Sequence, residues 1–167
     1  MTMRDIVLWP DTRLTELCAR IAAITPEIET LATDMLETMY DAPGRGLAGP
    51  QVGAMQRIFV MDTEWKEGSP APMVFINPEI ETCSKTQAVQ GEGCLSIPGV
   101  AVEVSRPAEV TLRWTDLAGK AQRRMFSGFA AACVQHELDH LNGIVTLDHL
   151  TEAARASVEA DYADTLS

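Results

Sequence analysis

The sequence predicts a mixed α+β fold in which residues 1–167 form a single domain. Segments with apolar residues at helical spacing and with helix-end signals occur in the first and last quarters of the chain, and strand-like segments lie between them. With 167 residues, 46% hydrophobic and 22% charged, the chain is long enough for one packed core. No internal repeat, low-complexity tract or linker divides it.

The net charge, the apolar runs and the cysteine content disfavour several classes of protein. A formal net charge of −11 argues against direct binding of nucleic acid through the phosphate backbone. No apolar run reaches the roughly 18 residues that a membrane-spanning helix needs, and acidic residues flank the N-terminal apolar run, unlike a secretory signal. The four cysteines include no Cys-x-x-Cys pair, which indicates reduced thiols and a cytoplasmic protein.

Two helices are expected in the first part of the chain. Asp11 is a suitable N-cap for a helix over 11–22, where apolar residues recur at helical spacing. Thr25-Pro26 combines a capping residue with a proline at the first helical position, and an apolar stripe follows. We expect this second helix to end near Gly44.

The middle of the chain is expected to be β-structure. Buried strands are predicted at 57–62 and 73–80, on either side of a polar loop. Alternation of apolar and polar residues then predicts further strands, two of which form a hairpin that turns at Ala118-Gly119. These strands are 101–106, 108–114 and 121–126.

The last third should contain two helices. One spans about 127–141, because an apolar run leads into it and Asn-Gly follows directly. A short strand is expected at 144–148. A final helix over about 151–164 has a threonine as its N-cap.

The first of these two helices carries the segment QHELDHLNG, which indicates a metal site. His136 and His140 are four residues apart, so both imidazoles lie on one face of the helix and can reach one ion. Glu137 lies beside that pair without being on the ligand row, which suits a general base or acid. The alternative is an ordinary helix with satisfied polar groups, but two buried histidines and two acids are unfavourable without a metal or hydrogen-bond partners.

The identity of a third ligand stays open on spacing alone. Thr146 occupies the position of the third histidine in the long zinc-protease signature, which disfavours that class. Glu152 and Glu159 are alternatives of the thermolysin type, although both lie on a predicted surface helix. Cys94 is another candidate; a lone cysteine, however, is more often a small buried hydrophobe.

Two glycine-rich segments complete the unusual features. GRGLAGPQVG, residues 44–53, is either a connecting loop or a place where backbone approaches a ligand, and it offers the side-chain amide of Gln51. It lacks the Lys-Ser/Thr ending of a phosphate loop, so nucleotide binding is disfavoured. EGCLSIPG, residues 92–99, sets Cys94 among turn-forming residues, where a thiolate can point into a cleft.

Three blocks together, GRGLAGPQ, EGCLS and QHELDH, resemble the signature motifs of peptide deformylases in order and separation. The segments IVLWPDTRL, INPEI and GIVTLDHL are similar to that family as well, so the resemblance covers most of the chain. It implies an α+β fold with antiparallel β-sheets packed around a central metal-binding helix. It also implies removal of the N-formyl group from the initiator methionine of new bacterial or organellar polypeptides.

The resemblance assigns roles to individual residues. It implies that Cys94, His136 and His140 hold one divalent metal ion, Fe²⁺ in the cell, with Zn²⁺ or Ni²⁺ also accepted. Glu137 would transfer protons. Gln51 and the backbone N–H of Leu95 would stabilise the oxyanion.

The substrate pocket also follows from the resemblance. A methionine pocket would be lined by Gly46, Phe129, Cys133 and His136. Arg106 matches an arginine that lies near the substrate cleft in the family. The alternative is that Arg106 pairs with Glu92. The substrates are N-formyl-methionyl nascent peptides, which the protein would encounter at the ribosome.

The chain departs from the family pattern at several positions. Gly49 replaces the second alanine of the usual Ala-Ala pair, Arg45 stands where an aliphatic residue is common, and Thr146 replaces a frequent phenylalanine. The C-terminal helix is acidic, unlike the basic tail that some relatives use at the ribosome. Two other functions remain: a related metallohydrolase with a different N-acyl or peptide substrate, and a non-catalytic metal-binding relative.

Overall fold

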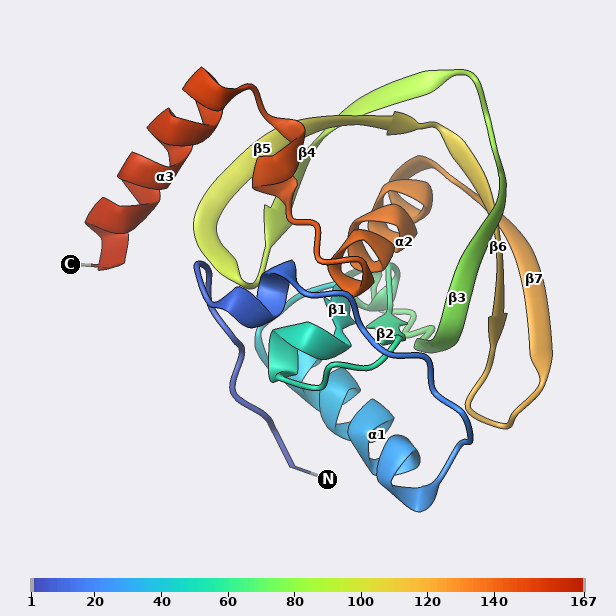
Figure 1. Ribbon diagram of the computed structural model, residues 1–167. Helices are drawn as coiled ribbons and strands as arrows, with labels where there is room; N and C mark the ends of the chain where they lie inside the picture. Colours follow the sequence, from blue (N-terminus) through green and yellow to red (C-terminus); the bar gives the residue numbers. More distant parts are fainter. Residues whose placement is uncertain (1, 167) are drawn as a thin grey trace.

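A computed structural model describes residues 2–166 of the chain. Within that range it contains two antiparallel sheets and three α-helices, arranged so that one helix lies between the sheets (Figure 1). This is the α+β architecture that the sequence predicts. No helix within residues 2–166 is both long and apolar enough to cross a membrane.

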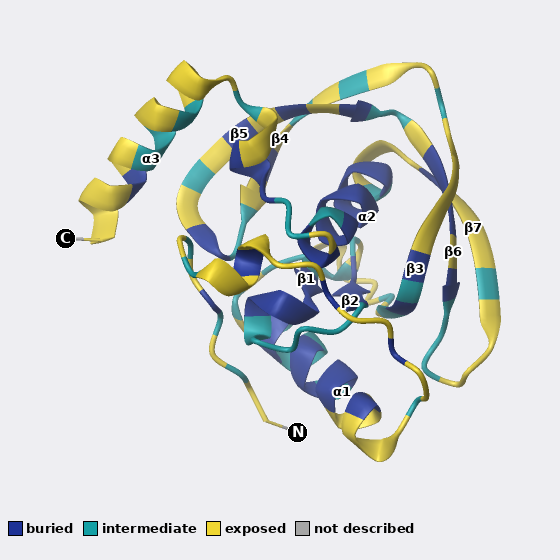
Figure 2. Ribbon diagram, viewed as in Figure 1, coloured by how far each residue is buried: buried dark blue, intermediate teal, exposed yellow. Residues whose placement is uncertain are grey.

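The helix between the sheets is α2, Gly128–Leu141. It is dark blue along most of its length in Figure 2, and every residue from Ala131 to Leu138 is buried. It begins at a glycine with φ of 58° and is followed directly by Asn142-Gly143, as the sequence predicts. Because both faces of α2 are covered, its histidines and acids are held inside the protein.

The larger sheet curves around one side of α2. Its strands run in the order β1-β2-β3-β6-β7, and each pairs antiparallel with its neighbours. Its inner face contributes packed aromatic rings: Phe59 stacks on Phe75 with centroids 4.4 Å apart, and Trp114 is tilted against Phe75 with centroids 4.5 Å apart. The strand bounds are β1 Gly46–Ala48, β2 Ile58–Met61, β3 Met73–Cys83, β6 Glu109–Thr115 and β7 Ala121–Ser127.

The smaller sheet is a two-stranded ribbon on the other side of α2. It consists of β4, Gln87–Cys94, and β5, Ile97–Pro107, which pair along their length. The pairing register shifts between Gly93 and Cys94, at the tip of the ribbon. That irregularity turns the end of β4 toward α2 and places Cys94 at the site described below.

The predictions of helices α1 and α3 are confirmed, including the threonine at the start of each. Helix α1, Pro26–Asp41, begins where the Thr25 hydroxyl accepts a hydrogen bond from the N–H of Ile28 at 3.3 Å, and its apolar stripe packs on β1 and β2. Helix α3, Glu152–Leu166, begins after Thr151, whose hydroxyl accepts from the N–H of Ala154 at 3.2 Å. It lies at the edge of the molecule in Figure 1.

The prediction of a helix over 11–22 is wrong. Only Thr12–Thr15 forms a helix, of the 3₁₀ type, and the chain then runs extended. Backbone groups of this segment bond to distant parts of the chain instead of to each other. Cys18 N–H donates to the Leu141 carbonyl at 2.9 Å, and Ala19 N–H donates to the Met55 carbonyl at 3.0 Å.

The prediction of a short strand at 144–148 is also wrong. The Asp148 carboxylate accepts a hydrogen bond from the Val145 N–H at 2.8 Å, which closes a 3₁₀ helix over Thr146–His149. The strands at 57–62 and 73–80 are confirmed, although β3 extends to Cys83 and its second half is exposed. The hairpin turn at Ala118-Gly119 is confirmed, with Gly119 at φ of 83°.

Candidate metal centre

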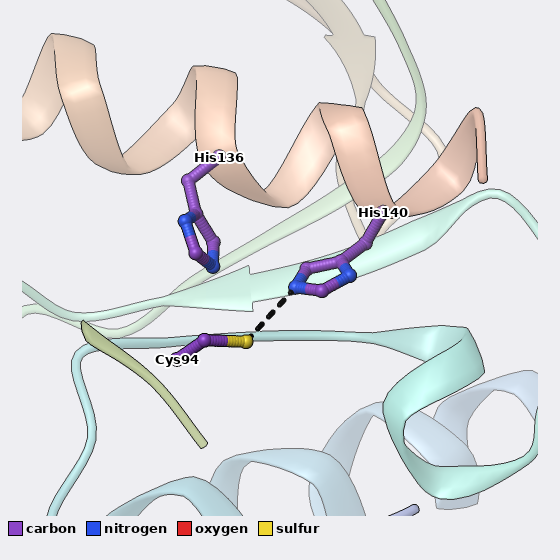
Figure 3. Close-up of side chains that lie close together, drawn as sticks. All are labelled: Cys94, His136 and His140. Atoms are coloured by element: carbon purple, nitrogen blue, oxygen red, sulfur yellow. Dashed lines mark hydrogen bonds between the residues drawn. The ribbon is translucent and has the colours of Figure 1, made fainter. Parts of the chain in front are cut away.

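Three side chains converge at the centre of the molecule. The Sγ atom of Cys94 and one ring nitrogen from each of His136 and His140 all lie within 4.8 Å of one another (Figure 3). The two imidazole rings are one helical turn apart on α2, with centroids 5.0 Å apart and planes nearly perpendicular. The thiol approaches from the tip of the β4–β5 ribbon, 3.4 Å from His140 Nε2. The structure therefore brings together the three residues predicted as ligands.

The spacing of these donors fits a metal ion. Sulfur and imidazole nitrogen atoms bound to one ion in a tetrahedral arrangement, at about 2.3 and 2.0–2.1 Å, would lie about 3.5 Å apart. Cys94 Sγ and His140 Nε2 are 3.4 Å apart. Burial lowers the pKa of His140 well below its usual value, so its imidazole is neutral and its lone pair is free to bind a cation.

A buried carboxylate oxygen without a partner supports the same interpretation, whereas a second such atom, His140 Nδ1, is not the nitrogen that faces Cys94. Among the described residues 2–166, Glu137 Oε1 and His140 Nδ1 are buried and have no hydrogen-bond partner. Burying such groups without a partner is unfavourable. If the centre receives an ion and a polar substrate, Glu137 Oε1 gains the hydrogen-bond partner that it otherwise lacks.

A buried ion pair fixes the orientation of His136. Its Nδ1–H donates to Glu92 Oε1 at 3.0 Å, so Nε2 faces the other two donors. Glu92 in turn accepts from Arg106 at 2.7 and 2.9 Å, and Arg106 also donates to Asp139 at 2.9 Å. Burial alone would raise the pKa of Glu92, but hydrogen bonds from Arg106 and His136 lower it to about 2.

Glu137 lies beside the donors without belonging to them. Burial raises its pKa to about 7, against the opposing effect of His136. The carboxylate packs against Gly46 on β1: a Cβ atom built at Gly46 would lie 2.5 Å from Glu137 Oε2 and 3.0 Å from Cys133 Sγ. The absence of a side chain at position 46 therefore makes room for the Glu137 carboxylate.

Gln51 connects the glycine-rich segment to the centre. The segment is not a mere loop: it forms β1 and then a 3₁₀ helix over Gly49–Val52. The amide oxygen of Gln51 accepts from the Ala48 N–H at 2.9 Å, and its Nε2 lies 3.1 Å from Ser96 Oγ and 3.7 Å from Cys94 Sγ. One of its two N–H groups therefore points along the edge of the metal site.

A cavity of about 760 Å³ opens beside the donors. Its lining includes the residues predicted for the methionine pocket, namely Gly46, Phe129, Cys133 and His136, and also Gln51, Cys94, Leu95 and Glu137. Arg106 is not part of this lining and is engaged by its two carboxylates. Sequence reasoning missed Asp139 as its second partner, although Asp139 is part of the QHELDH block, and it missed Lys66 at the cavity, for which no local pattern exists.

The fold and this centre indicate a class: an α+β metallohydrolase in which one cysteine and two histidines could hold the metal, with a glutamate beside them. The sequence profile of the polypeptide deformylase family matches residues 3–156. The chain belongs to that family, and its activity is the hydrolysis of the formyl amide at a peptide N-terminus.

Individual relatives agree over nearly the whole chain. Peptide deformylases of Rhodopseudomonas palustris (strain BisB5) and Afipia carboxidovorans are 48% and 49% identical, each over 95% of this chain and over 91% and 92% of the relative. A crystal structure of the Ehrlichia chaffeensis peptide deformylase in complex with actinonin matches with a TM-score of 0.93 and 36% identity, over 99% of this chain and 98% of that one. A Legionella pneumophila peptide deformylase structure matches with a TM-score of 0.92 and 35% identity, over 98% and 95%.

Proposed function

We propose that this protein removes the N-formyl group from the formyl-methionine of newly made polypeptides and releases formate. The observation that carries the proposal is the convergence of Cys94, His136 and His140 beside a cavity that the Glu137 side chain also lines. The apolar wall formed by Phe129 and Cys133 suits an unbranched side chain such as methionine.

One divalent ion would be held by Cys94, His136 and His140, and we propose Fe²⁺ in the cell, with Zn²⁺ or Ni²⁺ also able to occupy the site. Such an ion supplies a Lewis acid that polarises the formyl carbonyl and lowers the pKa of water to about 7. Three protein ligands leave room for substrate, which is typical of catalytic centres.

Glu137 moves the proton. Its carboxylate accepts a proton from the attacking water as the oxygen adds to the formyl carbon, and it returns that proton to the amine when the C–N bond breaks. A pKa of about 7 suits both transfers near neutral pH. The products are formate and a peptide with a free N-terminal amine, so all atoms of the water are accounted for.

Gln51 and Leu95 stabilise charge on the formyl oxygen in this proposal. The Gln51 side-chain amide is fixed by Ala48 and Ser96, so one donor is already oriented before substrate binds. Leu95 follows Cys94 at the ribbon tip and would contribute its backbone N–H. Arg106 would act through Glu92 and His136 and not by touching the substrate, because it does not line the cavity.

The setting of the reaction follows from the substrate. We propose that residues 1–167 form a single catalytic domain that works in the cytoplasm, where formyl-methionyl chains leave the ribosome. In an encounter there, α3 would present acidic side chains, because it carries Glu152, Glu159 and Asp161.

The test is formate release from formyl-Met-Ala-Ser under anaerobic conditions, with the metal content measured on the same sample. We expect formate in proportion to the amount of bound metal. Acetyl-Met-Ala-Ser and unmodified Met-Ala-Ser are included to detect a different N-acyl or peptide substrate. Cleavage of either in place of the formyl peptide, or no turnover by metal-loaded protein, would contradict the proposal.

A further inference from the structure

The mouth of the cavity carries positive charge on a protein whose formal net charge is −11. Four charged side chains other than histidine belong to the described residues that line the cavity: Arg45, Lys66, Glu92 and Glu137. Glu92 is neutralised by Arg106, and Glu137 is buried beside the metal ligands. The cations on Arg45 and Lys66 are therefore the charges that the cavity presents toward solvent.

Arg45 is held in place by the apolar wall. Its guanidinium carbon lies 5.3 Å from the centroid of the Phe129 ring, a cation–π distance. The Nε atom is buried and has no hydrogen-bond partner within residues 2–166. Within residues 2–166 its one ion pair runs from Nη2 to Glu67 Oε1, is 3.5 Å long and joins side chains that are 32% and 64% exposed. Such a pair contributes little, so the terminal nitrogens of the Arg45 guanidinium remain available to a ligand.

Lys66 is placed at the mouth by a fixed turn. The preceding residue, Trp65, donates its indole N–H to the Gly44 carbonyl at 2.9 Å and its backbone N–H to Asp62 at 3.1 Å. The Lys66 ammonium lies 5.5 Å from the Trp65 ring centroid. This turn therefore ties a second cation to the segment that directly precedes Arg45.

We propose that Arg45 and Lys66 select substrates with an acidic side chain at the second or third residue, a preference that rests on the proposed deformylase function. The first side chain enters the apolar part of the cavity, where Phe129 and Cys133 lie. Each following residue advances about 3.3–3.6 Å in an extended peptide, so the second and third residues pass the mouth. A carboxylate there meets the guanidinium donors of Arg45 and the ammonium of Lys66.

The experiment compares kcat/KM for matched peptides with an amidated C-terminus. Formyl-Met-Glu-Ala-amide is paired with formyl-Met-Gln-Ala-amide, and formyl-Met-Ala-Glu-amide with formyl-Met-Ala-Gln-amide. In at least one pair we expect the glutamate peptide to be preferred about fivefold, mainly through KM, as for a partly exposed ion pair. In about 1 M salt, where the screening length is about 3 Å, the preference should fall toward one.

Single and double variants of Arg45 and Lys66 test whether these two cations cause the preference for glutamate peptides. Arg45→Met and Lys66→Met should each lower the glutamate-to-glutamine ratio, and the double variant should bring it to about one. Glu67→Gln should raise the ratio, because it removes the carboxylate that competes for Arg45. Arg20→Met is the matched control: it removes one exposed cation that does not line this cavity, so the ratio should stay as in the parent.

The failures of the two proposals are distinguishable. If no formyl peptide releases formate, the proposed function is wrong. If the glutamine peptides are deformylated but the parent shows no preference, or if the double variant keeps the parent's ratio, only the inference about Arg45 and Lys66 is wrong. The salt dependence is measured on the parent protein, so the test stands even if one variant fails to fold.

Discussion

Gly46 and Glu137 are in contact so close that any side chain at position 46 would collide with the carboxylate, since a Cβ atom there would lie 2.5 Å from Oε2. Gly46→Ala should therefore displace Glu137 and lower kcat by about 10- to 100-fold, part of the contribution of a general base. Metal content should stay near that of the parent. Gly91→Ala is the control, because a Cβ atom at that position of β4 meets nothing within 4 Å. Equal effects of the two substitutions on kcat would contradict this account.

Glu137→Gln should separate metal binding from chemistry. The amide is nearly isosteric with the carboxylate but cannot accept the proton from water. We expect kcat to fall by about 10²–10⁴-fold, with a smaller change in KM, because the substrate is held by other groups. Steady-state kinetics on formyl-Met-Ala-Ser and metal analysis of the same protein provide the check. Metal-loaded Glu137→Gln enzyme with kcat within a few-fold of the parent would show that the residue has another role.

Cys94→Ala should empty the metal site. The thiol is one of three donors that lie within 4.8 Å of one another, and two imidazoles one turn apart on a helix hold an ion far less tightly than three ligands. Cys83→Ser is the matched control, since Cys83 is an exposed free cysteine at the end of β3. Elemental analysis should find metal in Cys83→Ser and little in Cys94→Ala. Full metal stoichiometry in both proteins would remove Cys94 from the ligand set.

Arg106→Leu should destabilise the fold strongly. The Arg106 and Glu92 side chains are only 7% and 8% exposed, so the substitution leaves a buried carboxylate without its partner. The free energy of unfolding should fall by about 3–5 kcal/mol. Arg113→Leu breaks an ion pair with Glu79 of similar length but with side chains 58% and 57% exposed, and it should cost at most about 1 kcal/mol. Denaturant unfolding of both variants gives the comparison, and similar losses would contradict the assigned role of burial.

The cysteine thiols should differ in reactivity. Burial raises the pKa of Cys18 to about 11, so at pH 8 about one thiol in a thousand is ionised, and the fraction increases only as pH rises toward that value. Cys83 is exposed. Alkylation of the metal-loaded protein at pH 8, followed by mass spectrometry of the peptides, should find Cys83 modified first. Faster labelling of Cys18 would mean that its segment opens readily.

Local sequence signals predicted those parts of the protein whose partners are close in the chain. Thr25-Pro26 begins α1, Gly119 makes the β6–β7 turn, and the spacing of His136 and His140 places two donors on one face of α2. Each of these features is decided within a few residues.

Other features depend on residues that are far apart in sequence. The segment after Thr15 has helical spacing but runs extended, because its backbone groups bond to Met55 and Leu141. Glu92 orients His136 across 44 positions. Spacing alone did not identify Cys94 as the third donor, and only the resemblance to a family did so, because nothing in the local sequence says that the β4–β5 ribbon will end against α2.

The separation of the donors along the chain has a consequence for how the protein is made. Cys94 precedes His140 by 46 positions, and both strands of the β6–β7 hairpin are synthesised in between. While the polypeptide is being translated, the thiol therefore leaves the ribosome well before either imidazole. In the proposed centre, all three side chains can bind one ion only after α2 has emerged and docked, so loading of the centre would be a late event of biosynthesis. Until then the Cys94 thiol would be without its metal, and the time needed to translate the chain from β5 to α2 is the shortest period for which it stays so.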